Sequence, residues 1–161
     1  MRLETEIVAN RYRDRLFAAA LSICRNPADA DDAVQDTLLQ YHTAQKEFES
    51  EAHIRAWLLR VAINRAKNIT LSFWRRSMLP LEQYAETLSF ETAADGELFH
   101  EVMHLPEKYR IVIHLFYYED YSVREIAGIL KLKESTVRVR LMRGRKLLKE
   151  ALKEEWSDDD E

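Results

Sequence analysis

Residues Ser122–Leu148, SVREIAGILKLKESTVRVRLMRGRKLL, decide the fold of the second half of the chain. The stretch opens with Ser122 and Glu125 in S-x-x-E spacing, in which each side chain caps a backbone N–H group of the other residue. Apolar residues at helical spacing follow, and after a polar turn at Lys131–Lys133 a second helical pattern carries most of the cations. Two short helices joined by a tight turn, the second of them basic, predict a helix-turn-helix that reads the major groove of DNA. An ordinary helical hairpin with a solvated basic face is the alternative interpretation.

Charge is unevenly distributed along the sequence. The 161 residues carry a formal net charge of −4, which by itself argues against nucleic-acid binding. From Lys131 to Lys149, however, the net charge is +7. Local charge rather than the total decides where a polyanion binds, so the helix-turn-helix remains a DNA-binding candidate.

The composition indicates a helical protein of the cytoplasm. Hydrophobic residues make up 47% and charged residues 32%, with only 3 Gly and 3 Pro. The single cysteine, Cys24, allows no intrachain disulfide, and its apolar neighbours predict a buried, unreactive thiol. Because we find neither the apolar core of a signal peptide nor the ~20 apolar residues of a membrane span, we expect no direct membrane insertion.

Three amphipathic helices are predicted in the first half, where apolar residues recur at three- and four-residue spacing. They cover Glu6–Arg25, Pro27–Gln45, and Ile54 to the region of Arg75. Asn26 and Pro27 supply a cap and a first-turn proline for the second helix.

Residues 77–96 show weak periodicity and turn residues at both ends, which predicts a linker with little fixed structure. We therefore expect an all-α fold of two small helical domains, a bundle in residues 1–76 and a four-helix domain with the helix-turn-helix in residues 97–153. Residues 154–161 form an acidic tail, and we expect the chain to fray from Glu150 onward.

The second predicted helix carries a row of carboxylates. Asp29, Asp32 and Asp36 lie on one face at i, i+3 and i+7. Acids stabilise the first turn of a helix, which accounts for Asp29 but not for Asp36. A docking face for a basic partner is the second interpretation of this row.

The third predicted helix combines cations with aromatic residues. Residues 52–81 contain no Asp or Glu and have a net charge of +6. Cations that follow the phosphates and aromatic rings that stack on bases make a surface for single-stranded nucleic acid. One face of the helix presents Trp57, Arg60, Asn64 and Lys67. Trp57 could equally be a core anchor.

His100–His104, HEVMH, matches the H-E-x-x-H pattern in which two histidines bind zinc and the glutamate is the base. Pro106 interrupts the helix soon afterwards, and no downstream motif supplies a third ligand. We interpret the match as chance, and we expect no metal, no cofactor and no catalytic activity.

Together these segments resemble a bacterial RNA polymerase sigma factor of the sigma-70 family, extracytoplasmic-function (ECF) subfamily, which has only regions two and four. Asp29–Tyr41 is similar to the region-two helix that docks on the polymerase clamp helices, and Ala56–Lys67 to the segment that melts and reads the minus-ten element. Leu105–Arg110 resembles the start of region four, and Thr136–Arg143 its recognition helix.

The resemblance implies promoter recognition, DNA melting and transcription initiation, with all bond-making left to the polymerase. It implies three partners: core RNA polymerase, through its beta-prime clamp helices and beta flap, promoter DNA, and an anti-sigma factor. The implied core-polymerase contacts are Asp29, Asp32, Gln35, Asp36 and Gln40. The implied minus-ten contacts are Trp57, Arg60, Asn64 and Lys67, with a base flipped near residues 48–53. The implied minus-thirty-five contacts are Arg124, Lys133, Ser135, Thr136, Arg138, Arg140 and Arg143.

Three positions depart from the family pattern. Lys131 occupies a turn position where glycine is usual, and a left-handed lysine costs roughly 1 kcal/mol there. Lys133 replaces a Ser or Thr cap, and Gly144 replaces alanine at a cost of about 1 kcal/mol in helix stability.

An autonomous helix-turn-helix regulator is the alternative function, although it would need a dimer to span two half-sites. An interaction protein without a DNA role would leave the two basic stretches unexplained.

Overall fold

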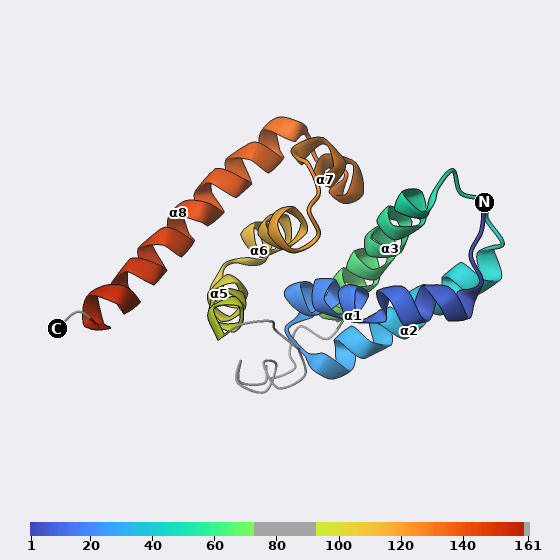
Figure 1. Ribbon diagram of the computed structural model, residues 1–161, viewed down its shortest axis with the longest axis horizontal. Coiled ribbons are helices and arrows are strands. Elements are labelled where there is room, and N and C mark those ends of the chain that lie inside the picture. The colour runs from blue at the N-terminus through green and yellow to red at the C-terminus, as the bar shows by residue number, and fades with distance from the viewer. Residues whose placement is uncertain (73–92, 160–161) are drawn as a thin grey trace. The chain divides into compact units, whose positions relative to one another are not determined.

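The computed structural model describes the backbone of residues 1–72 and 93–159 and the side chains of residues 1–70 and 98–153. Within these residues every regular element is a helix, which confirms the all-α prediction (Figure 1). The described residues fall into two compact units, one before residue 73 and one after residue 92. Most of the predicted linker, together with Phe73 and Trp74, lies outside the described residues.

The N-terminal unit consists of α1 (Thr5–Cys24), α2 (Pro27–Ala44) and α3 (Glu51–Ser72), and each of the three helices packs against the other two. Small and aliphatic side chains fill its centre, because they allow the three helices to approach closely. The predicted inner faces of α1 and α2 are buried, and Cys24 is buried as expected. The core includes Leu16, Ala20, Ile23, Ala30, Val34, Leu38, Tyr41, Ile54, Leu58 and Ala62.

Local capping sets the starts of α2 and α3. The Asn26 side chain accepts a hydrogen bond from the Asp29 N–H group at 3.1 Å, which confirms the predicted cap of α2. α3 begins at Glu51 rather than at Ile54, because the Ser50 hydroxyl accepts a bond from the His53 N–H group at 3.1 Å and caps an earlier turn.

The C-terminal unit consists of α5 (Ala93–His104), α6 (Glu107–Ile113), the π-helix η1 (His114–Tyr118), α7 (Val123–Leu130) and α8 (Glu134–Asp159). α8 packs against α5, α6 and α7. α5 begins at Ala93, so its first turn lies inside the range 77–96 that the sequence assigned to the linker. Two consecutive alanines favour this earlier start.

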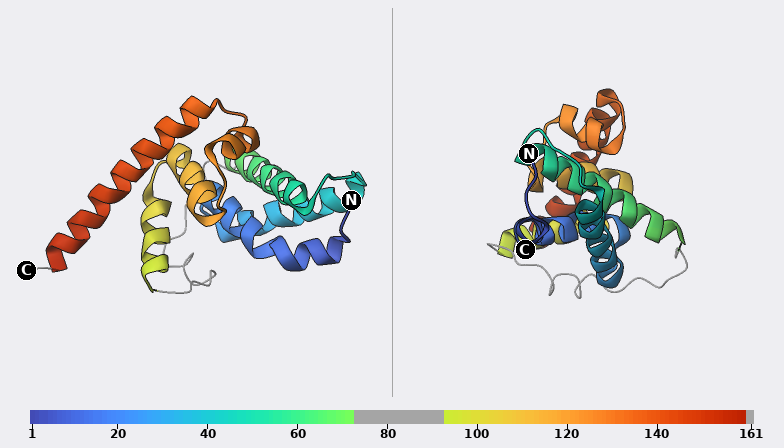
Figure 2. Two further views of the ribbon diagram at one scale, coloured as in Figure 1. Left: turned by 45° about the horizontal axis from the view of Figure 1, so that its top comes forward. Right: turned by 90° about the vertical axis from the view of Figure 1, so that its right-hand side faces the viewer.

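The end of α8 differs from the frayed tail that the sequence predicted. The helix continues without a break past Glu150 to Asp159, as Figure 2 shows. Lys, Glu, Ala and Leu, which make up residues 150–155, are all good helix formers, so the charge of this segment does not end the helix.

Gly144 marks the place where α8 crosses α6 at close range. A Cβ atom at this position would lie 3.1 Å from Cγ1 of Ile113 and 3.4 Å from Cβ of Tyr109. Close helix approach is therefore the structural role of this glycine, and it offsets part of the propensity cost.

Candidate nucleic-acid interface

The helix-turn-helix is built as the sequence predicts. The Ser122 N–H group donates to Oε1 of Glu125 at 3.0 Å, and the Glu125 N–H group donates to Oγ of Ser122 at 3.2 Å, which completes the capping box. Lys131 is left-handed, with φ 55°, and its N–H group bonds to the Ala127 carbonyl. Because this residue ends α7 sharply, α8 can begin three residues later at a new angle.

The first turns of α8 separate a buried face from an exposed one. Val137, Leu141 and Leu148 are buried, as the sequence predicts. Of the predicted minus-thirty-five residues, Thr136 and Arg140 are half-buried and the others are exposed: Arg124, Lys133, Ser135, Arg138 and Arg143.

A shallow hollow lies beside this exposed face. It is lined by Ser135, Thr136, Arg140 and Arg143 from α8, and by Lys108 and Tyr109 from α6. The sequence analysis did not assign Lys108 or Tyr109 to the DNA-binding surface, because they lie far from the recognition helix in the chain. Lys108 is exposed and lines the hollow together with Arg140 and Arg143, so it adds to the positive charge of the same surface.

Arg138 is engaged within its own helix. Its Nη2 atom lies 3.2 Å from Oε2 of Glu134, one turn earlier, and the two side chains are 62% and 45% exposed. Exposed pairs of this kind contribute little to stability, so a phosphate or a base edge could replace Glu134 at small cost.

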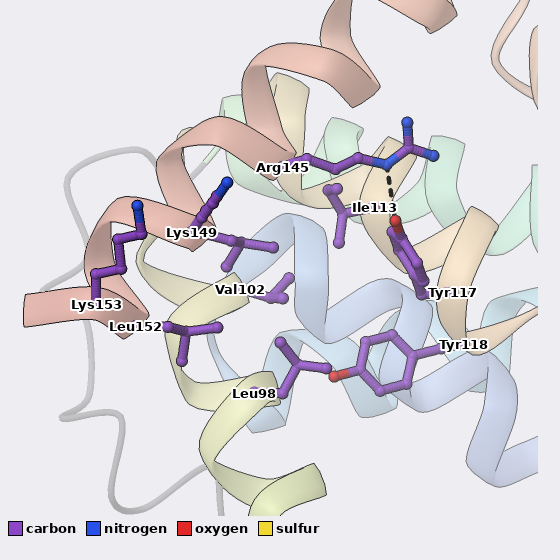
Figure 3. A pocket seen from close by; sticks show the side chains of 10 residues that line it. Leu98, Val102, Ile113, Tyr117, Tyr118, Arg145, Lys149, Leu152 and Lys153 are labelled. Carbon is purple, nitrogen blue, oxygen red and sulfur yellow. Dashed lines mark hydrogen bonds between the residues drawn. The ribbon is translucent and has the colours of Figure 1, made fainter. Parts of the chain in front are cut away.

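Arg145 belongs to a different surface. Its Nε atom donates to the Tyr117 hydroxyl at 2.7 Å, and its guanidinium carbon lies 5.0 Å from the centre of the Phe116 ring. It borders a groove of about 610 Å³ between α5, η1 and α8 (Figure 3). Apolar residues that include Leu98, Val102, Ile113, Leu148 and Leu152 line this groove, and Lys149 and Lys153 line it one and two turns further along α8 than Arg145. The basic stretch of α8 thus serves two surfaces.

The acidic row on α2 is shorter than the sequence predicted. Asp32, Gln35 and Asp36 are exposed, but Asp29 is only 6% exposed. Asp29 lies in the first turn of α2, where an acid favours the helix N-terminus, and burial removes it from the exposed row. Leu39, which the sequence did not single out, is 62% exposed one turn after Gln35 and Asp36.

Gln40 is half-buried and faces α3. Its Oε1 atom accepts a hydrogen bond from Nη2 of Arg65 at 3.0 Å. This contact links Gln40 to α3, and the assignment of Gln40 to core polymerase stays a prediction.

Trp57 belongs to an aromatic cluster between α2 and α3. Its ring is half-buried and packs edge-on against two other rings. The distance between ring centres is 6.1 Å to Tyr41 and 5.8 Å to Phe48. Phe48 is 4% exposed, and its ring centre also lies 5.1 Å from that of His53. The ring is therefore anchored on one side and accessible on the other. Along the same face of α3, Asn64 is exposed, and Arg60 and Lys67 are half-buried.

The two histidines of HEVMH contact each other on α5. Their ring centres are 4.6 Å apart, and Nδ1 of His104 lies 2.9 Å from the His100 carbonyl oxygen. Among the described residues no group of three His, Cys, Asp or Glu could hold a metal ion. None of the described helices is long and apolar enough to cross a membrane.

Two family models match the chain, one for each unit. Residues 8–77 match sigma-70 region 2, and residues 96–148 match sigma-70, region 4. The chain belongs to the sigma-70 family of RNA polymerase sigma factors. The resemblance that the sequence motifs carry is confirmed, and this sigma factor acts in promoter recognition and transcription initiation.

Its relatives are sigma factors of the ECF group. The ECF RNA polymerase sigma factor SigW of Bacillus subtilis is 26% identical over 168 residues, which cover 91% of this chain and 88% of SigW. The ECF RNA polymerase sigma factor SigM of Mycobacterium tuberculosis is 29% identical over 139 residues, which cover 84% of this chain and 70% of SigM.

Two solved structures have the same fold. The sigma factor RpoE of Bartonella quintana, in complex with the anti-sigma factor NepR, gives a TM-score of 0.71 at 23% identity, over 92% of this chain and 96% of RpoE. CnrH, in complex with the cytosolic domain of CnrY, gives a TM-score of 0.64 at 26% identity, over 92% of this chain and 87% of CnrH.

Proposed function

We propose that this sigma factor uses three separate surfaces in initiation: α2 for core polymerase, α3 for the melted minus-ten strand, and α7–α8 for the minus-thirty-five duplex. The observation that carries the proposal is the segregation of charge. Exposed carboxylates gather on α2, whereas residues 52–70 of α3 contain four cations and no Asp or Glu, and exposed cations gather on the first turns of α8.

The α2 surface suits a basic partner helix. Asp32 and Asp36 are exposed one turn apart, with Gln35 between them. Complementary charge speeds encounter and fixes orientation, while the exposed Leu39 supplies the apolar contact that such a polar face otherwise lacks. The beta-prime clamp helices of core polymerase are the partner that we assign to this face.

The α3 surface suits an unpaired strand. The accessible side of Trp57 can stack on a base, Asn64 can bond to a base edge, and Arg60 and Lys67 can follow the phosphates. A base flipped out of the duplex would be bound beside the loop of residues 48–53, next to Trp57.

The helix-turn-helix suits the major groove of duplex DNA. The first turns of α8 would enter the groove, where Ser135, Thr136, Arg138, Arg140 and Arg143 can reach bases and phosphates. Arg124 and Lys133 flank the turn and would contact phosphates.

The groove bordered by Arg145 suits an apolar segment of the polymerase, and we assign it to the beta flap. Its apolar lining would bury such a segment, and the adjacent cations would orient it. We further propose that an anti-sigma factor controls this protein, because the sigma factor RpoE of Bartonella quintana, which has the same fold, is bound to the anti-sigma factor NepR in its structure. Because these partners act in the cytoplasm, we assign the protein to that compartment and all bond-making to the polymerase.

Run-off transcription with purified core polymerase tests the proposal. We expect specific transcripts from a genomic DNA library only when core polymerase and this protein are both present. The protein alone should bind promoter duplex weakly in a gel shift. Tight, sequence-specific binding without polymerase, together with no stimulated transcript, would instead support an autonomous regulator.

A further inference from the structure

We propose that Arg2 is a positioning residue for minus-ten recognition, which it serves through the loop between α2 and α3. The inference rests on the proposed role of α3 in holding the melted strand. Arg2 lies far in the sequence from every residue assigned to that strand, and only the tertiary structure brings it to the loop.

Arg2 caps the end of α2. Its guanidinium donates to the carbonyl oxygens of Tyr41, His42 and Lys46, with Lys46 at 3.2 Å. The last carbonyls of a helix have no partner within the helix, and a cation at that end is also favoured by the helix dipole. Arg2 therefore joins the final turn of α2 to the loop that follows it.

The residues around Arg2 reinforce this cap. The guanidinium lies 4.3 Å from the centre of the Tyr41 ring, and the Tyr41 hydroxyl in turn donates to the Leu3 carbonyl. Beyond the helix, the Phe48 N–H group donates to the Met1 carbonyl at 2.9 Å. Residues 1–3 thus lie alongside the loop, as Figure 1 shows at the N-terminal end.

The first residues of the chain hold much of this loop: besides the contact of Arg2 with Lys46, the N-terminal ammonium of Met1 donates to Glu47 at 2.8 Å and to the Phe48 carbonyl at 2.9 Å. Gln45 leaves α2 in a left-handed conformation with φ 48°, and residues 45–47 are exposed. A non-glycine residue in this conformation stays there only where surrounding contacts hold it. The contacts of Arg2 with Lys46 and of Met1 with Phe48 supply that restraint from outside the loop.

Phe48 transmits the restraint to the minus-ten surface. Its ring stacks on the Tyr41 ring and packs edge-on against the Trp57 ring, and in both pairs the ring centres are 5.8 Å apart. A shift of the loop would move Phe48 and leave one side of Trp57 unsupported, because buried rings are close-packed. Arg2 would then affect how Trp57 meets a base without touching DNA.

The measurement is the selectivity of open-complex formation by the holoenzyme. The permanganate reactivity of the melted strand is measured on a promoter recovered by run-off transcription and on the same promoter with one minus-ten base changed. The ratio of the first signal to the second is the selectivity. A loss of folded protein lowers both signals equally and leaves their ratio unchanged. The ratio therefore reports positioning rather than stability.

We expect Arg2→Ala to lower this ratio by about fivefold, which is within the range that one base contact contributes. Arg2→Lys keeps the charge at the end of α2 and should give an intermediate ratio. Arg13→Ala removes an exposed arginine from α1 and should leave the ratio unchanged. Core-polymerase affinity should stay within about twofold of the parent for all three variants, since Arg2 is not on the exposed α2 face.

An unchanged ratio for Arg2→Ala would overturn the inference, even if total activity fell. Trp57→Ala and Asn64→Ala separate this result from a failure of the proposed function. If these two variants lower the ratio and Arg2→Ala does not, only the role of Arg2 is wrong. If neither lowers it, the minus-ten assignment of α3 is wrong.

Discussion

Arg65 on α3 donates a hydrogen bond from Nη2 to Oε1 of Gln40 on α2, over 3.0 Å. The bond joins the helix proposed to bind polymerase to the helix proposed to bind the melted strand. It engages Gln40, which lies one turn after Asp36, with α3. Gln40 is therefore expected to support the packing of the two helices.

Gln40→Ala should lower the free energy of unfolding by about 0.5–1 kcal/mol, because it removes one side-chain hydrogen bond. Arg65→Ala should cost a similar amount, and the double variant should cost less than the sum. Urea unfolding followed by circular dichroism measures all three. Strictly additive losses would mean that the bond does not form in solution. Gln35→Ala, at an exposed position, is the matched control.

Reversing the charge of the α2 face should abolish assembly with core polymerase. Asp32→Arg combined with Asp36→Arg replaces attraction to a basic partner by repulsion, and both positions are exposed, so the fold should survive. Core affinity by fluorescence titration and helicity by circular dichroism are the measurements. Glu6→Arg with Asp14→Arg makes the same change in net charge on α1 and should retain binding. Equal affinity for both double variants would refute the docking face.

The ion pair between Arg138 and Glu134 should restrain minus-thirty-five binding. Arg138→Ala should weaken binding of holoenzyme to promoter duplex by ~1–3 kcal/mol if the arginine contacts a base. Glu134→Gln frees Arg138 and removes a negative charge beside the phosphates, so it should strengthen binding. Affinities at several salt concentrations test both variants. Stronger binding after Arg138→Ala would contradict the assignment.

His114 should make the C-terminal unit sensitive to acid. The ring is buried and neither nitrogen has a hydrogen-bond partner, and burial lowers the pKa of His114 from 6.5 to about 4. Because the unfolded chain binds the proton more tightly, stability is complete above pH 6.5 and is lost as the pH falls towards 4. The loss from this group between pH 7 and pH 5 should be about 2 kcal/mol.

His114→Leu should remove that part of the pH dependence and raise stability at pH 5, since it also removes two unpaired polar atoms from the core. Urea unfolding at pH 7, 6 and 5 compares the variant with the parent. Parallel stability curves for the two proteins would show that His114 does not contribute.

Lys131→Gly should raise the free energy of unfolding by about 0.5–1 kcal/mol, because glycine adopts the left-handed turn without the steric cost that a side chain incurs. Lys131→Ala removes the same charge but keeps a Cβ atom in the left-handed position, and it should not stabilise the protein. Thermal unfolding of both variants provides the test. A gain of stability in both would point to charge rather than to backbone conformation.

The helical segments and their buried faces were predictable because apolar spacing and capping are local properties. The capping box at Ser122 and Glu125 and the cap at Asn26 form as the sequence predicts. The cap at Ser50 was not foreseen, nor was the π-helical turn after Ile113. Both depend on which of several nearby hydrogen-bond partners a backbone group finds once its neighbours are packed.

The acidic end of α8 shows what the tertiary structure adds to charge counting. The sequence places the acids beyond Glu150 close behind the basic stretch, which suggests that they weaken its hold on DNA. α8 instead runs as one helix of 26 residues, about 39 Å long at 1.5 Å per residue. Its DNA-binding turns lie at one end and its acids at the other, so these acids act at a distance where salt screens them.

The stretch Ser122–Leu148 by itself determined the helix-turn-helix, because helix periodicity, a capping box and a turn are encoded by neighbouring residues. The tertiary structure decided which side chains are accessible. It buried Asp29, engaged Gln40 with Arg65, divided the cations of α8 between a DNA-facing surface and an apolar groove, and brought Arg2 to the loop before α3. These outcomes depend on contacts between residues distant in the chain, and no local pattern specifies such contacts.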